Sequence, residues 1–569
     1  MARTVGIGIQ DYGKIIENNR FYVDKTSFIK EWWDSGDEVT LITRPRRFGK
    51  TLTMSMVEHF FSVRYAGRSD LFEGLSIWDD EHYRVLQGTY PVISLSFAIV
   101  KETNFKTASY RIRQLLMQLY EQYRFLQESS RLSDAEKENY ARMASNMSEE
   151  DTAMALHKLS EFLYRHYGKK VIILLDEYDT PMQEAYVSGY GNEIAGLTGS
   201  MFNAAFKTNP WLERALMTGI TRVSKESIFS DLNNLTVVTT TSNKYAESFG
   251  FTEQEVFAAM DELGRPEKQK VKEWYDGFTF GSVTDIYNPW SIINYLSEGS
   301  FAAYWANTSA NGLVGKLIRE GDKEVKTAFE DLLKGGTLEV EIDEQIVFNQ
   351  LDTKQNAVWS LLLACGYLKI EKWEFDEVSG TNYYTLTLTN KEVRIMFRKM
   401  IQDWFYNGSH AYNAFVKALF LGDIDAMNEY MNRVTLATFS DFDTGSGMGS
   451  VDTSQIEPER FYHGFVLGLI VDLSGRYTIT SNRESGFGRY DVMLEPQNAQ
   501  DDAIILEFKV YRPKMEKNLN ETVQNALTQI EKMQYAASLT AKALTAKGIA
   551  PERIKKYGFA FEGKNVLIG

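Results

Sequence analysis

The sequence predicts an α/β protein built from several domains. Its 569 residues correspond to about four domains at ~150 residues each, so one compact core is not expected. Apolar residues make up 44% and charged residues 24%, which is usual for globular chains and excludes collagen-like and wholly disordered classes. Short apolar runs alternate with helical patterns over residues 1–260, which predicts a largely parallel sheet there.

The first region, residues 1–260, supplies the elements of that sheet. Its strand candidates are the apolar runs 39–42, 91–97, 171–175 and 216–220. Helical patterns cover 110–123 and 153–167, and the polar stretch 127–151 between them predicts a helical insertion or lid.

The middle of the chain divides into two regions. Residues 261–345 read as a mainly helical lid region, interrupted by a Gly- and Asn-containing stretch at 276–289. Residues 346–440 then predict a helix at 355–368, strands at 369–376 and 382–389, and a helix at 391–406. This order is winged-helix-like, a pattern that serves protein contacts as readily as DNA contacts.

A Gly/Ser/Asp/Thr-rich stretch at 440–454 predicts a flexible linker before the last region, 451–569. The elements expected after it are a helix at 458–473, strands at 477–481, 489–494 and 503–510, a long helix at 519–547 and a strand at 557–561.

The formal charge of −15 argues against a protein coated in basic surface, although a local basic site stays open. Residues 451–569 contain 15 Lys+Arg and 15 Asp+Glu, so the rest of the chain carries the whole excess. A neutral C-terminal region permits contact with an anionic polymer. The nearest basic cluster there is Lys509, Arg512, Lys514 and Lys517.

The single cysteine, Cys365, excludes an intramolecular disulfide and a thiolate metal site. The first ten residues lack the charged-then-apolar pattern of a leader, and no run approaches ~18 apolar residues. These features predict a cytoplasmic protein without a membrane span. The sequence does not specify an oligomeric state.

A phosphate-binding pattern follows the first strand candidate. The loop after residue 43 ends in Gly49-Lys50-Thr51 and precedes the helix-compatible stretch 52–61. In such a loop the backbone amides and the helix N-terminus bind phosphate oxygens, lysine neutralises phosphate charge and the hydroxyl ligates Mg²⁺. The residues expected at the nucleotide are Arg46, Arg47, Phe48, Gly49, Lys50 and Thr51. Arg44 stands where the motif usually has its first glycine.

An acidic pattern after another strand candidate supports a nucleotide site. The apolar run 171–175 ends in Asp176-Glu177, where an aspartate at the strand tip holds Mg²⁺ and a glutamate polarises the attacking water. Alternatively, the two motifs are only a helix start and an N-cap. Arg222, after the strand at 216–220, is expected either to offset charge at the phosphates or to be a surface arginine.

A nuclease-like pattern lies in the last region. Glu507 and Lys509 are two apart in an apolar strand candidate, so they project from one face, and Asp491 lies in the preceding strand candidate. Asp491 and Glu507 would hold Mg²⁺ while Lys509 orients water. The alternative is a surface ion pair worth less than ~1 kcal/mol. Weaker candidates for this site are Glu484, Glu459 and Gln529.

These motifs together resemble the bacterial AAA-ATPase-like proteins fused to a PD-(D/E)XK-superfamily nuclease domain. The residues that carry the resemblance are Ile9-Gln-Asp, Tyr22-Val-Asp-Lys-Thr26, Arg44-Pro-Arg-Arg-Phe-Gly-Lys-Thr51, Asp176-Glu-Tyr-Asp179, Trp274-Tyr-Asp-Gly-Phe278, Tyr287-Asn-Pro289, Ser481-Asn-Arg-Glu-Ser-Gly486 and Glu507-Phe-Lys509. The resemblance implies Lys50, Thr51, Asp176 and Glu177 as the ATP and Mg²⁺ residues. It also implies Asp491, Glu507 and Lys509 as the nuclease core, although Tyr490 replaces the proline of the superfamily name.

The leading hypothesis is a Mg²⁺-dependent nuclease acting on nucleic acid, with DNA the favoured substrate, under the control of an N-terminal ATPase. A second hypothesis is an ATP-dependent regulatory switch whose nuclease-like tail binds nucleic acid or a protein partner without cleaving. A third is an ATP-binding scaffold in which neither centre turns over.

Overall fold

The computed structural model describes most of the chain. The described residues are 3–221, 232–305, 314–315, 317–318, 323–342, 355–377, 380–405, 411–438, 466, 470, 473, 476–481, 484–485, 488–489, 492–498, 501–532 and 551–569. The chain forms two compact units. The first comprises Met1–Leu317 and Gly335–Arg394, and the second Ile318–Lys334 and Ile395–Gly569.

The first unit is built on a five-stranded, all-parallel sheet, as the apolar runs predict. Its strand order is β2-β3-β4-β1-β5, so β4 separates the strand before the phosphate loop from the strand that ends in Asp176. The strands are β1 Val39–Thr43, β2 Val92–Ser96, β3 Val171–Asp176, β4 Leu212–Gly219 and β5 Leu235–Val238. Because parallel strands end at the same edge, the ends of β1, β3 and β4 bring their polar residues together.

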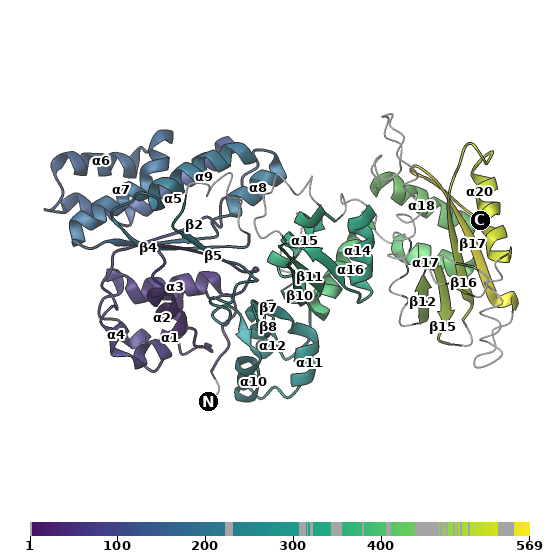
Figure 1. The fold of residues 1–569 in the computed structure, drawn as a ribbon, viewed down its shortest axis with the longest axis horizontal. Coiled ribbons are helices and arrows are strands. Elements are labelled where there is room, and N and C mark those ends of the chain that lie inside the picture. Colours follow the sequence, from purple (N-terminus) through teal and green to yellow (C-terminus); the bar gives the residue numbers. More distant parts are fainter. Residues whose placement is uncertain are drawn as a thin grey trace. The chain divides into compact units, whose positions relative to one another are not determined.

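Helices cover both faces of this sheet (Figure 1). One layer contains α1 Tyr12–Glu17, α2 Ser27–Asp34, α3 Lys50–Phe61 and α4 Glu81–Arg84, and the other contains α5 Phe105–Glu121, α6 Asp134–Ser145, α7 Glu149–Tyr167, α8 Thr180–Ser188 and α9 Gly191–Phe206. The polar stretch 127–151 supplies α6, whose buried Tyr140 bonds to the carbonyl of Tyr120 on α5. The helix is therefore an insertion packed on its neighbours.

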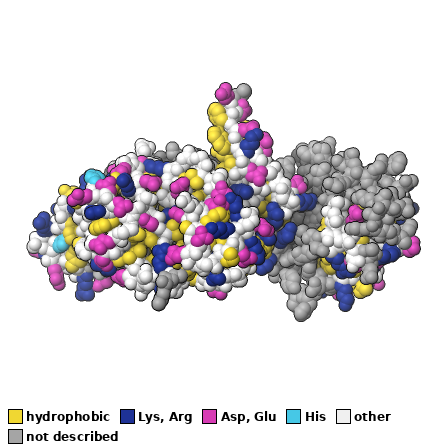
Figure 2. Space-filling model, turned by 90° about the horizontal axis from the view of Figure 1, so that it is seen from below, with side chains coloured by type: hydrophobic (Ala, Val, Ile, Leu, Met, Phe, Trp, Pro, Cys, Tyr) yellow, Lys and Arg dark blue, Asp and Glu magenta, His cyan; other side chains and the backbone are white. Residues whose placement is uncertain are grey.

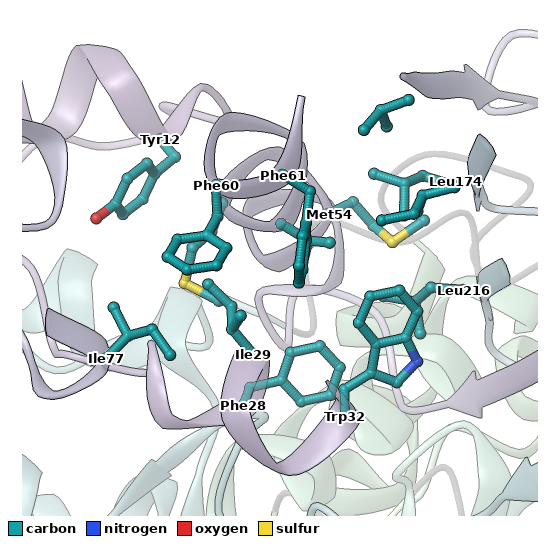
Figure 3. Close-up of a cluster of buried hydrophobic side chains, with 14 of the residues drawn as sticks. Tyr12, Phe28, Ile29, Trp32, Met54, Phe60, Phe61, Ile77, Leu174 and Leu216 are labelled. Carbon is teal, nitrogen blue, oxygen red and sulfur yellow. The ribbon is translucent and has the colours of Figure 1, made fainter. Parts of the chain in front are cut away.

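An aromatic core fixes helix α3, which begins at the phosphate loop, against the sheet. The side chains gathered there include Tyr12, Phe28, Ile29, Trp32, Met54, Phe60, Phe61, Ile77, Leu174 and Leu216 (Figure 3). All of these are at most 3% exposed. Burial of apolar area on this scale holds the start of α3 in place relative to β3 and β4.

The rest of the first unit consists of small elements after the sheet. They are β6 Phe251–Thr252, α10 Glu253–Glu262, α11 Lys268–Tyr275, β7 Phe278–Phe280, β8 Val283–Tyr287, α12 Pro289–Glu298, β9 Leu338–Glu341, α15 Gln355–Ala364, β10 Leu368–Asp376, β11 Thr381–Leu388 and the start of α16 Lys391–Phe405. The helix, β-ribbon, helix order agrees with the winged-helix-like expectation. On the ribbon, Trp373 is 61% exposed.

The second unit contains a five-stranded mixed sheet in the order β12-β15-β16-β17-β18. Its elements are α14 Lys323–Leu333, α17 Ala411–Leu421, α18 Ile424–Thr438, β12 Tyr477–Ser481, β13 Glu484–Ser485, β14 Gly488–Arg489, β15 Val492–Pro496, β16 Ala503–Val510, α20 Leu519–Lys532, β17 Ile554–Glu562 and β18 Asn565–Ile568. The expected strands are present, and β16 and β17 are parallel. Most of the expected helix at 458–473 and the end of the one at 519–547 lie outside the described residues.

Helices α17 and α18, which lie within the predicted middle region 346–440, pack on this C-terminal sheet. Phe415, Leu419 and Met431 share one core with sheet residues such as Ile504 and Leu506. The core of the sheet therefore depends on chain that precedes the expected linker.

Two asparagines of α18 close the edge of the sheet. Asn428 exchanges two hydrogen bonds with the backbone of Ile568, at 2.9 and 2.7 Å. Asn432, one turn later, does the same with Val566, at 2.6 and 2.9 Å. Edge strands are sites of intermolecular pairing, so these amides occupy groups that another strand would otherwise use.

We expect the double substitution of Asn428 and Asn432 by alanine to destabilise the second unit by about 2–4 kcal/mol and to promote association. Four hydrogen bonds are lost, and the backbone of β18 loses its side-chain partners. Thermal unfolding and light scattering measure the two effects. Gln524→Ala, at an exposed amide on α20, is the control, and equal melting and scattering of the two proteins would contradict the prediction.

Candidate nucleotide and nuclease sites

The phosphate loop occupies residues 44–49, between β1 and α3. Gly49 precedes the helix with φ 81°, in the left-handed region that glycine adopts without strain. Arg47 also has a positive φ, of 64°. The first amides of α3 have no partner within the helix, which makes this end of the helix suited to an anion.

Lys50 is folded into the loop. Its ammonium donates to the carbonyls of Arg44 and Pro45, at 2.9 and 2.7 Å, and the residue is 7% exposed. Burial lowers the pKa of Lys50 to about 8, against the opposing influence of nearby acids, with Asp176 the largest. A polyphosphate beside this ammonium would favour its charged form.

Thr51 and Asp176 meet although they are far apart in the sequence. The Thr51 hydroxyl donates to Asp176 Oδ2 at 2.7 Å, and the Thr218 hydroxyl donates to the other carboxylate oxygen. Asp176 is 6% exposed. A hydroxyl and a carboxylate so close are oxygen ligands of the kind that Mg²⁺ prefers, so the residues present fit a Mg²⁺–nucleotide.

Glu177 follows Asp176 with φ 51°, an unusual conformation for a residue with a side chain. Its Oε2 accepts a hydrogen bond from the Thr180 hydroxyl at 3.2 Å, and the residue lines the cavity at the loop. The strained backbone is a feature often found at functional sites.

The arginines and the phenylalanine of the loop have separate environments. Arg46 donates to Gln183 Oε1 at 3.3 Å, and the Arg47 guanidinium lies 4.4 Å from the centre of the Trp290 ring. Phe48 is 1% exposed and packs edge-on against Phe278 at 4.7 Å. We therefore expect the backbone of Phe48, rather than its ring, to meet a phosphate.

Arg44, at the position of the usual glycine, is a buried anchor. Its φ is not positive, so the backbone does not require glycine there. The fully buried guanidinium donates to the carbonyls of Thr43 and Thr239 and lies 4.3 Å from the centre of the Phe280 ring. Burial lowers the pKa of Arg44 to about 9. Arginine in place of the usual glycine thus adds side-chain contacts at the start of the loop without requiring a different backbone conformation.

A cavity of about 360 Å³ opens at the phosphate loop. Its lining also includes segments far from the loop in the sequence, among them Ile9, Gln10, Tyr22, Phe251, Trp290 and Ile293. The lining therefore combines polar loop residues with apolar side chains, both of which a nucleotide with phosphates and a base requires. Arg222 lies outside the described residues.

In the second unit, Glu507 and Lys509 lie on β16 inside the sheet. Glu507 is 1% exposed, accepts from the amide of Gln529 on α20, and has Oε1 3.9 Å from Lys509 Nζ. This burial does not fit the solvent-facing ion pair of the alternative interpretation. Gln529, a weaker candidate in the sequence, is thus brought to the site.

The remaining acidic candidates for the nuclease site are Asp491, Glu459 and Glu484. Asp491 and Glu459 lie outside the described residues, and Glu484 is placed only through its backbone in β13. Val492, the chain neighbour of Asp491, pairs with Leu506, the residue before Glu507.

Two family models match the chain. Residues 6–229 match a family described as "Predicted AAA-ATPase", and residues 457–569 match the PD-(D/E)XK nuclease superfamily. The chain joins an AAA-ATPase-like domain to a PD-(D/E)XK nuclease superfamily domain. A curated protein of Azotobacter chroococcum mcd 1, "Uncharacterized protein in vnfD 5'region", is 25% identical over 391 residues, which are 68% of each chain. The printed description of that protein names no activity.

Asp179 of the AAA-ATPase-like domain received no role from the sequence. Its carboxylate is 1% exposed and accepts from the amides of Ile220 and Thr221, each at 2.9 Å, and from Gln183. It therefore ties the end of β4 to the strand that carries Asp176. Its place three residues after Asp176 in Asp176-Glu-Tyr-Asp179 is the signal that could have identified it.

Within the described part of the chain, one trio of acids is close enough to share an ion, namely Glu253, Asp276 and Asp285. The Lys272 ammonium lies among them, 2.5 Å from Glu253 and 3.1 Å from Asp285. Burial, followed by the neighbouring Asp285, raises the pKa of Asp276 to about 7. The trio is thus an ion-pair cluster with its own lysine.

The nuclease-superfamily domain has an exposed basic loop directly after Glu507 and Lys509. Arg512, Lys514 and Lys517 are exposed there, and Glu516 orders the loop by accepting from the Arg512 amide and the Thr522 hydroxyl. Elsewhere, acidic and basic side chains are interspersed over the surface shown in Figure 2. No helix among the described residues combines the length and apolar character needed to span a membrane.

Proposed function

We propose that the AAA-ATPase-like domain binds and hydrolyses Mg²⁺–ATP and controls cleavage of nucleic acid, with DNA the favoured substrate, by the nuclease-superfamily domain. The contact between Thr51 and Asp176 carries the proposal for ATP. It joins the two halves of the expected Mg²⁺ site across a sheet edge that also has a cavity of suitable size.

In this proposal the loop amides and Lys50 bind the phosphates, and Thr51 and Asp176 hold the metal ion. Glu177 accepts a proton from the attacking water, a role that its place beside Asp176 and its exposure to the cavity support. The Arg44 side chain fixes the start of the loop to the chain at 239–244.

At the second centre, Glu507 and Asp491 would hold Mg²⁺, and the ion would supply Lewis-acid activation of the water that attacks phosphorus. Lys509 orients that water or balances phosphate charge, and Gln529 fixes the Glu507 carboxylate. The exposed arginine and lysines at 512–517 contact the nucleic-acid backbone, which gives salt-dependent binding.

A cleavage assay on the full chain tests the combined function. We expect a double-stranded DNA substrate to be cut with Mg²⁺ and ATP, and to be cut at least about tenfold more slowly without nucleotide, if the two centres are coupled. A matched RNA substrate and a non-hydrolysable ATP analogue form the other arms. Salt-dependent DNA binding without cleavage in any arm would instead support the regulatory switch, and equal cleavage with and without ATP would refute the coupling.

A further inference from the structure

The carbonyl of Arg46 in the phosphate loop is held by two side chains from outside the loop. Asn288 Nδ2 donates to it at 3.3 Å and Trp305 Nε1 at 3.0 Å. Asn288 and Trp305 are each 1% exposed, so water does not compete for these donors. Both follow the residues that match the ATPase family model.

A buried carboxylate fixes the position of these donors. Glu392, in the first turn of α16, accepts from the Trp305 amide at 2.5 Å and from the Ser291 hydroxyl at 2.8 Å. Ser291 lies in the first turn of α12, whose N-cap is Asn288. Glu392 is 1% exposed, so one desolvated group connects both carbonyl donors to the start of α16.

Aromatic packing follows the same route. Phe48 of the loop contacts Phe278, Phe278 contacts Trp305 at 5.6 Å, and Trp305 contacts Tyr367 at 5.4 Å. The backbone also approaches closely, since a Cβ placed on Gly366 would lie 2.8 Å from the ring of Pro45. The loop at 45–48 therefore has little room to move without displacing these neighbours.

Phosphate binding would change the hydrogen bonds of the loop backbone at residues 44–46. Lys50 donates to the carbonyls of Arg44 and Pro45, the two residues directly before Arg46. When its ammonium turns to a polyphosphate, those two carbonyls lose their donor. The Asn288 and Trp305 bonds to the next carbonyl then decide how far the backbone at 44–46 shifts.

We propose that Trp305 and Asn288 are positioning residues of the nucleotide site, and that Glu392 couples their position to the first turn of α16. The inference rests on the proposed function, because it takes the loop as the ATP site. Coupling is reciprocal, so ATP alters the order of this turn, and loss of the contacts alters ATP affinity. Helix α16 continues from there to Phe405.

Conservative variants of the full chain test the proposal. Asn288→Asp keeps the oxygen that caps α12 but removes the N–H that reaches Arg46, and Asn294→Asp on the same helix is its matched control. Trp305→Phe removes the indole N–H, and Trp373→Phe on the exposed ribbon is its control. If Trp305→Phe fails to fold, Asn288→Asp still tests the bond to the Arg46 carbonyl.

We expect both test variants to bind Mg²⁺–ATP about tenfold more weakly in calorimetric titration than their controls. Hydrogen exchange at residues 392–397 should change when ATP saturates the unaltered chain and both controls, but not when it saturates the test variants. A merely structural role would not remove this ATP-dependent change.

Control-like ATP affinity together with an ATP-dependent exchange change in both test variants would overturn the inference while leaving the ATP site intact. Failure of the unaltered chain to bind Mg²⁺–ATP would overturn the proposed function and this inference together. A failure of the inference thus shows in the test variants, whereas a failure of the proposed function shows in the unaltered chain.

Discussion

Lys50→Ala is expected to abolish ATP hydrolysis and to weaken Mg²⁺–ATP binding by about 100-fold or more. The buried ammonium donates to two loop carbonyls, and its removal takes away the positive charge that the proposal places beside the phosphates. Phosphate release and calorimetric titration measure the two effects. Lys106→Ala is the control, because Lys106 is an exposed lysine on α5 of the same domain.

The same lysine predicts a pH dependence. Burial lowers the pKa of Lys50 to about 8 in the nucleotide-free protein, and bound phosphate must raise it because phosphate favours the charged ammonium. The association constant for Mg²⁺–ATP should therefore fall as the pH rises above about 8, by at most tenfold per pH unit. Lys106→Ala should keep this fall, whereas Lys50→Ala should lose it. A flat profile for the unaltered chain would contradict the role of Lys50.

Glu507→Gln is expected to reduce nucleic-acid cleavage by about 1000-fold or more while leaving ATP hydrolysis in place. The amide has the size of the carboxylate and keeps an oxygen for Gln529, but it no longer offers a charged ligand to Mg²⁺. The amide keeps the volume of the carboxylate, so the change creates no cavity in the buried site.

Cleavage rates over a Mg²⁺ titration check this expectation, with thermal unfolding to confirm the fold. Glu562→Gln is the control, since it is an exposed glutamate on the neighbouring strand β17. Lys509→Ala should also impair cleavage. Undiminished cleavage by Glu507→Gln would remove Glu507 from the metal site and leave the nuclease assignment without its described ligand.

Much of the fold could be predicted because apolar runs report burial directly. Strands β1 and β3 are buried at every position, so their sequences stand out. Strand β5 was not predicted, since it is four residues long and its first three are only half-buried. The packing of α17 and α18 on the C-terminal sheet could not be predicted either. A helical pattern shows which face of a helix is apolar but not which sheet that face packs against.

The candidate sites divide in the same way. Lys50, Thr51 and Asp176 were recognisable because their chemistry repeats in a fixed local motif. The bond from Trp305 to the Arg46 carbonyl was not, since it joins positions 259 apart and uses a backbone acceptor without a sequence signature. The proximity of Gln529 to Glu507 likewise depended on how α20 packs on the sheet.

The amide pairs of α18 limit how this protein can be divided or recombined. Asn428 and Asn432 supply partners to β18, the edge strand of the sheet, and they precede the expected linker at 440–454. A gene fragment encoding only the matched nuclease segment, 457–569, would lose these partners together with the core residues of α17 and α18. The part of the chain needed to complete this folded sheet is therefore longer than the family match. An exchange of nuclease ends between related proteins would succeed only where the crossover falls before α17.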